Sequence, residues 1–247
     1  MESIQNFLNR LNDLIWGLPL LAILVIVGIF LTIRTKGLQF RYLYYAHKLA
    51  FTRQDDSAQG DISHFQALMT ALAATIGIGS ITGVATAIAI GGMGALVWMW
   101  LAALFGMATK YGEAILAIKY RVTDETGEMC GGPMYYIEKG MRWKWLAILF
   151  AIFGGITAFG TGNMVQANSV ALAISDLFNI HPIWTGIVLM IVVGMALLGG
   201  IKSIGKVSAI IVPTMAIFYI IGGLAIIVYK ITAVPAAFAL IFRSAFH

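Results

Sequence analysis

The stretch "ALAATIGIGSITGVATAIAI", residues 71–90, is apolar enough to cross a lipid bilayer, yet it contains Gly77 and Gly79 among several hydroxyl side chains. Glycine weakens a helix, and hydrocarbon offers no hydrogen-bond partner to backbone groups that a helix leaves free. At about 1.5 Å per residue, a helix from His64 to Ile90 would be roughly 40 Å long, which places the two glycines near the bilayer midplane. The stretch therefore predicts a membrane helix that is interrupted at half depth.

The composition of the whole chain predicts an all-α integral membrane protein. Of its 247 residues, 60% are hydrophobic and 11% are charged, whereas a soluble domain carries about 25% charged residues. The apolar runs are continuous rather than alternating, which favours helices over strands. The net charge of +5 predicts no nucleic-acid partner, because the basic residues lie in short clusters between apolar runs.

Six spans are predicted, and the basic residues indicate their orientation. The spans cover 14–33, 64–90, 95–117, 145–177, 183–198 and 207–229. Twelve of the sixteen Lys and Arg residues fall in segments 34–63, 118–144 and 199–206, which are therefore expected in the cytoplasm, and both termini are expected outside. Within the second segment, "GGPMYYIEKG" predicts a short surface helix that begins near Pro133.

Two interpretations of the interruption remain open at this point. Gly79 and Gly83 form a GxxxG pair, which would let a neighbouring helix approach closely. Alternatively, the helix unwinds and lines a cavity. Freed carbonyl groups would then hold a cation while the amides of the following half-helix face an anion. Thr75, Ser80 and Thr82 would add hydroxyl oxygens, which suit a sodium ion.

Polar residues in two further spans have a structural and a functional interpretation each. Lys110 and Glu113 lie three residues apart on one helical face. We expect a structural ion pair, which lowers the cost of each charge in the membrane, with a proton relay through Glu113 as the alternative. Asn163, Gln166 and Asn168 either hydrogen-bond to neighbouring helices or form a wall of a substrate cavity.

Three stretches resemble the alanine or glycine:cation symporter family, the sodium:alanine symporters. They are "GGMGALVWMWLAALFG" (91–106), "GMATKYGEAILAIKYR" (106–121) and "GGPMYYI" (131–137). The resemblance implies a prokaryotic plasma-membrane transporter that carries alanine or glycine together with sodium ions, or in some members protons. It implies no enzymatic chemistry and no cofactor besides the coupling ion.

The resemblance also implies a LeuT-like fold, in which an extra N-terminal helix precedes two inverted five-helix repeats. Under this mapping, 1–63 comprise an extracellular N-terminus, the extra helix and a cytoplasmic basic loop, and 64–247 form the first repeat. The second repeat is missing, so the expected partner is the C-terminal half of the transporter. A channel-like subunit and a non-transporting membrane subunit are the alternatives.

The interrupted helix supplies most of the predicted binding residues. Backbone and hydroxyl groups at the interruption are expected to bind substrate and sodium, with Thr75 and Ser80 as the hydroxyl ligands of the ion. Gln166 and Asn168 are expected on the cavity wall. The full predicted set is Ala74, Thr75, Gly77, Gly79, Ser80, Gln166 and Asn168. The family commonly has Gly-Thr-Gly-Asn where this chain has "GIGS" (77–80), so one hydroxyl and one amide side chain are replaced here.

Overall fold

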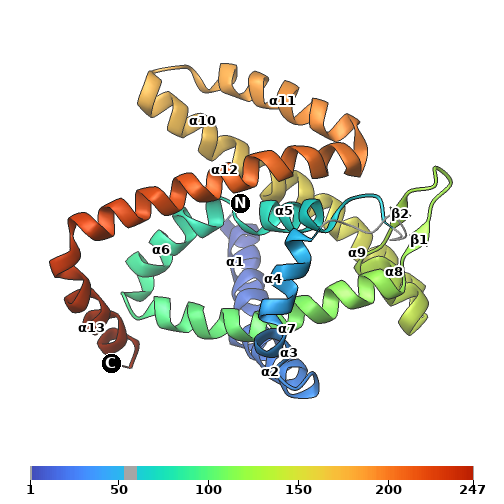
Figure 1. Cartoon of the computed structure of the whole chain (residues 1–247), viewed down its shortest axis with the longest axis horizontal. Helices are drawn as coiled ribbons and strands as arrows, with labels where there is room; N and C mark the ends of the chain where they lie inside the picture. Colours follow the sequence, from blue (N-terminus) through green and yellow to red (C-terminus); the bar gives the residue numbers. More distant parts are fainter. Residues whose placement is uncertain (1, 53–59, 247) are drawn as a thin grey trace.

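The computed structural model describes residues 2–52 and 60–246, and its long elements are helices (Figure 1). Arg53, one of the predicted cytoplasmic bases, lies outside the described residues. The α-helices are α1 (Glu2–Trp16), α2 (Leu18–Arg34), α3 (Leu38–Arg41), α4 (Leu43–Phe51), α5 (His64–Thr75), α6 (Thr82–Gly91), α7 (Ala95–Lys119), α8 (Pro133–Tyr136), α9 (Lys144–Thr157), α10 (Val165–Phe178), α11 (Pro182–Leu198), α12 (Gly200–Tyr229) and α13 (Val234–Ala245). Short 3-10 turns cover Ile78–Ser80 and Ile231–Ala233, and π-helical segments cover Ile137–Met141 and Ala158–Met164.

The described part of the chain contains four continuous helical stretches that are long and apolar enough to cross a membrane, and a fifth that is bent. The continuous ones are Gln5–Arg34, Ala95–Lys119, Lys144–Phe178 and Gly200–Tyr229. The fifth joins α5 to Ile78–Gly91 with a bend of 65°. The span predicted over 183–198 coincides with α11, whose 17 residues are at the lower limit of the roughly 17–25 that cross a bilayer, and it is a shorter apolar helix outside the candidate spans. The chain is therefore an all-helical, multi-pass membrane protein with four or five candidate spans rather than six.

Two local predictions are corrected by the structure. Residues 199–206 were expected as a loop, but the chain turns at Gly199 and α12 begins at Gly200. The turn is possible because Gly200 has a φ of +64°, a left-handed conformation that glycine adopts readily. The expectation of helices alone also omitted a small antiparallel hairpin, formed by β1 (Val122–Thr123) and β2 (Met129–Cys130). The surface helix expected near Pro133 is present as α8.

Side-chain hydrogen bonds fix the turn of this hairpin. Asp124 Oδ1 accepts the Thr126 hydroxyl at 2.7 Å, the Thr126 amide at 2.9 Å and the Glu128 amide at 2.8 Å. These donors favour the ionised carboxylate, so the Thr126 hydroxyl, followed by the Glu128 amide, lowers the pKa of Asp124 below its ordinary value. Asp61 Oδ2 accepts the Met129 amide at 2.8 Å and joins the hairpin to the chain just before α5.

Glycines set the closest helix crossings. A Cβ on Gly28 of α2 would lie 2.7 Å from Cβ of Phe105 on α7, and one on Gly205 of α12 would lie 3.4 Å from Cβ of Gln66 on α5. Such small residues let helices approach in a membrane, where burial of apolar surface gives no drive for association. In Figure 1, α5 and α6 lie between α7 and α12, and α10 and α11 form a hairpin beyond α12. These crossings position the bent span beside α12.

Candidate functional site

The bent span is interrupted at the glycines that the sequence singles out. Helix α5 ends at Thr75, and Ile76 and Gly77 have extended backbone conformations. One 3-10 turn follows at Ile78–Ser80, and α6 begins at Thr82. The alternative of close helix packing on Gly79 and Gly83 finds no support, since no atom of the described residues lies within 4 Å of a Cβ built on either. The predicted interruption is confirmed.

The break leaves backbone groups of both signs without partners. Within the described residues, the carbonyl oxygens of Ala73, Ala74 and Ile76 accept no hydrogen bond, and the amides of Gly77 and Gly79 donate none. The amides of the first turn of α6, at 82–84, are likewise unpaired in this part of the chain. Carbonyl dipoles at the end of α5 favour a cation, and the amides at the start of α6 favour an anion.

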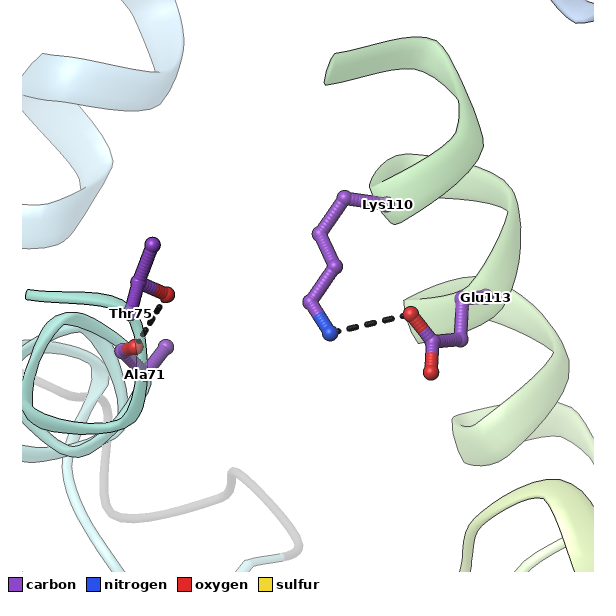
Figure 2. Close-up of polar contacts among 4 residues, drawn as sticks. All are labelled: Ala71, Thr75, Lys110 and Glu113. Carbon is purple, nitrogen blue, oxygen red and sulfur yellow. Dashed lines mark hydrogen bonds and ion pairs between the residues drawn. The ribbon is translucent and has the colours of Figure 1, made fainter. Parts of the chain in front are cut away.

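The hydroxyl groups of the break are already used as donors, and this arrangement leaves their lone pairs available. Thr75 Oγ1 donates to Ala71 O at 2.8 Å, as Figure 2 shows, and Ser80 Oγ donates to Thr75 O at 3.3 Å across the break. Thr82 Oγ1 donates to Ile78 O at 3.0 Å. A hydroxyl has one proton and two acceptor lone pairs, so each oxygen can still ligate a cation.

Gln166 of α10 contacts the break directly. Its Oε1 accepts the Ile78 amide at 3.2 Å. A Cβ on Gly77 would lie 3.4 Å from both Nε2 and Oε1 of Gln166, so the carboxamide covers the glycine. Asn168 is exposed and makes no hydrogen bond with any residue that the structure describes. The structure thus brings one of the two predicted wall residues to the break and leaves the other apart from it.

A cavity of about 250 Å³ adjoins the break on its α12 side. Ile76, Ser80 and Ile81 line it from the break, and α12 contributes Met215 and Tyr219, together with Ala216 and Ile220. Its volume is below the roughly 300–1,000 Å³ of pockets that hold drug-sized ligands, so it suits a smaller molecule. The α12 residues were not predicted, although the Tyr219 hydroxyl is a polar group in the middle of an apolar span and offered a signal.

The ion pair expected in α7 is present, and both of its side chains are exposed. Lys110 Nζ lies 2.9 Å from Glu113 Oε2. Figure 2 shows the Lys110 side chain running along α7 to the Glu113 carboxylate, and both residues line a cavity whose other wall is formed by Leu21, Leu24 and Val25 of α2. The two side chains are 73% and 40% exposed, so no other group of the described chain seals the pair. A proton relay through Glu113 stays a prediction.

Comparison with known proteins places the whole chain in one family. Residues 1–247 match the sodium:alanine symporter family. The chain is 56% identical over 247 residues to the sodium/alanine symporter AgcS of Methanococcus maripaludis, covering 98% of this chain and 54% of that protein. It is 42% identical over 241 residues to the putative sodium/proton-dependent alanine carrier protein YrbD of Bacillus subtilis (98% and 49% covered). It is 37% identical over 245 residues to the probable sodium/glutamine symporter GlnT of the same organism (99% and 51%).

The chain spans about half the length of the curated relatives it matches. The family predicted from the motifs between 91 and 137 is confirmed, because the match extends over every element described above, including the break and α10. The chain is a multi-pass membrane protein that belongs to the sodium:alanine symporter family, a family of transporters rather than enzymes.

Proposed function

We propose that this chain forms one half of a sodium-coupled symporter for small neutral amino acids, alanine or glycine, with the break between α5 and α6 as the binding site. One observation carries the proposal. Unpaired carbonyl groups end α5 and unpaired amides begin α6, beside a cavity of about 250 Å³. An amino acid and a sodium ion together present two positive charges and one negative charge, which this arrangement can hold without a charged side chain.

Each part of the break has a role in this proposal. The amides at the start of α6 face the substrate carboxylate, because the positive end of a helix dipole favours an anion. The carbonyl groups of Ala74 and Ile76 and the hydroxyl oxygens of Thr75 and Ser80 bind the sodium ion, for which oxygen atoms are suitable ligands. Gln166 holds the Ile78 amide and so fixes the conformation of the unwound segment. The small cavity selects against larger side chains.

The arrangement of the complete transporter is part of the same proposal. The chain supplies an extra helix within 1–63 and the first repeat, 64–247, of a LeuT-like fold in a prokaryotic plasma membrane, with its N-terminus outside. The second half rocks against the first to expose the site alternately to either side. Relatives named as sodium/alanine and sodium/glutamine symporters are about twice as long as the matched region, which supports a second half of similar size.

Uptake of alanine tests the proposal. The chain is co-expressed with the other half of AgcS and reconstituted in vesicles, and alanine uptake is measured with a sodium gradient, with a proton gradient and with neither. We expect uptake that requires the sodium gradient. Ungated conductance would favour a channel-like subunit, and no uptake with both halves folded would favour a non-transporting one. Either result refutes the symport proposal.

A pair of glycine variants tests the position of the site. Gly77→Leu places a side chain where only Gln166 now lies, and it is expected to abolish uptake. Gly222→Leu is the matched control, since no described atom lies within 4 Å of a Cβ at Gly222 of α12. Both variants should insert in the membrane at parental levels. Uptake that survives Gly77→Leu would show that binding occurs elsewhere.

A further inference from the structure

A second, larger cleft lies away from the break, between the segment after the first span and α7. Its volume is about 600 Å³, within the roughly 300–1,000 Å³ of sites that bury a small ligand. Tyr42, Leu43, Tyr45 and Leu49 line one wall. Met107 and Tyr111 of α7 line the other. The cleft shares no lining residue with the cavity beside the break, so its occupant is independent of the proposed transport function.

Helices α3 and α4 form nearly one helix that has an apolar face and a basic edge. The Tyr42 amide donates to Leu38 O at 3.0 Å and the Ala46 amide donates to Tyr42 O at 2.8 Å, so helical bonding continues through the join. The seven-residue spacing of Arg41 and Lys48 therefore places both on one stripe, which borders the face that lines the cleft. Both side chains are exposed, and Arg41 Cζ lies 5.8 Å from the centre of the Tyr42 ring.

The cleft lies level with the polar end of α2. Contacts of Gly28 with Phe105 and of Leu31 with Gly112 show that α2 and α7 run in the same direction. Arg34, about one turn after Leu31, consequently ends α2 close to the level of Tyr111. The end of an apolar span marks the boundary between hydrocarbon and headgroups, where tyrosine side chains are enriched.

The chain segment that forms the first wall of the cleft carries charge of one sign. Residues 34–52 contain four basic side chains and no Asp or Glu. The cations are Arg34 and Lys36 at the end of α2, and Arg41 and Lys48 beside the cleft. An apolar cleft at headgroup depth with a purely basic edge complements a ligand that joins an acyl chain to an anionic group.

We propose that this cleft binds an anionic phospholipid. One acyl chain lies along Leu43, Leu49 and Met107, the headgroup phosphate lies within reach of Arg41 and Lys48, and the tyrosine hydroxyls lie at the headgroup boundary. A protein segment would gain nothing from the basic edge unless it were acidic, whereas an anionic lipid of the surrounding bilayer meets both requirements. The bound lipid fills the space between α4 and α7 and so stabilises the docking of this segment.

Native mass spectrometry of the detergent-purified chain tests the proposal. The chain is titrated with phosphatidylglycerol and with phosphatidylcholine of the same acyl composition. We expect one phosphatidylglycerol to be retained in preference. Each basic side chain at a membrane surface raises the affinity for anionic lipid about fivefold. The double variant Arg41→Gln with Lys48→Gln is therefore expected to lower the affinity for phosphatidylglycerol roughly 30-fold. Lys202→Gln with Lys206→Gln removes the same charge from α12, which contributes no residue to the cleft, and is expected to leave retention unchanged.

A third variant distinguishes binding in the cleft from attraction by charge alone. Ala46→Trp fills the cleft without altering any charge, and it is expected to abolish the retained lipid while circular dichroism shows the parental helix content. Equal retention of the two lipids by the parent chain would overturn the proposal. So would equal loss in the Lys202 and Lys206 control, which would show nonspecific attraction. A dimer of the parent chain that Ala46→Trp dissociates would show that a second copy occupies the cleft, and this result would also overturn the proposal.

Discussion

Replacing Gln166 by leucine removes a side chain of α10 that hydrogen-bonds to the backbone of the break from outside the bent span. Leucine has a similar size but cannot accept the Ile78 amide, which Gln166 Oε1 now accepts at 3.2 Å. A hydrogen bond between neutral groups contributes about 1 kcal/mol net. That free energy corresponds to a factor of about five in the population of the open segment, and so in the exchange rate of the Ile78 amide.

Hydrogen exchange followed by mass spectrometry measures this effect on the chain as it stands. A peptide covering residues 72–82 reports the break, and we expect the Ile78 amide within it to exchange about fivefold faster in Gln166→Leu. Asn168→Leu is the matched control, because Asn168 lies on the same helix and has no hydrogen-bond partner among the described residues. If the two variants exchange alike, or if Gln166→Leu exchanges like the parent, Gln166 does not hold the break.

Three further variants test the packing, the charge pair and the hairpin. Gly28→Ala places a methyl group 2.7 Å from Cβ of Phe105, so α2 and α7 must separate. We expect the free energy of unfolding to fall by about 1–3 kcal/mol and the melting temperature to fall in fluorescence-detected gel filtration. An unchanged melting temperature would contradict the close crossing. Lys110→Gln leaves Glu113 unpaired in a span and is expected to lower stability by up to about 3 kcal/mol. The double variant with Glu113→Gln should recover this stability in the same assay, and failure to recover it would argue against pairing. Hydrogen bonds lower the pKa of Asp124. Their stabilisation of the hairpin is therefore fully present at pH values above the ordinary carboxyl pKa of about 4, and it is lost as the pH falls through the lowered pKa. Hairpin amides should therefore lose exchange protection only in acid, and Asp124→Ala, which removes the acceptor oxygen, should expose them at neutral pH as well.

The sequence predicted the break because its signal is local. Two glycines inside an apolar run leave few alternatives in a membrane, and Gly77 and Gly79 lie where α5 ends and the 3-10 turn begins. The surface helix at Pro133 was equally local, since proline favours the first turn of a helix. The hairpin was missed because its strands are two residues long and carry no alternating pattern.

Contacts between helices were harder to predict, for a physical reason. Apolar residues surround a membrane helix on all sides, so periodicity does not show which face meets a neighbour. Gln166 and Asn168 were therefore indistinguishable as wall residues, and only the crossing of α10 with the break separates them. Tyr219 was missed for the same reason. The amphipathic segment α3–α4 was overlooked because its 14 residues are too few to suggest a span.

The π-helical segment Ala158–Met164 lies directly before α10. The number of residues in its turn determines the direction in which Gln166 projects from α10. A π-helix accommodates an extra residue in its turn. If the segment tightened to α-helical winding, everything beyond it would rotate by about 100° around the axis. Such a rotation would move the Gln166 carboxamide away from Ile78, so that the hydrogen bond to the Ile78 amide is lost. The winding of residues 158–164 therefore sets the direction of Gln166, and deletion of one residue there is expected to remove the hydrogen bond to the Ile78 amide.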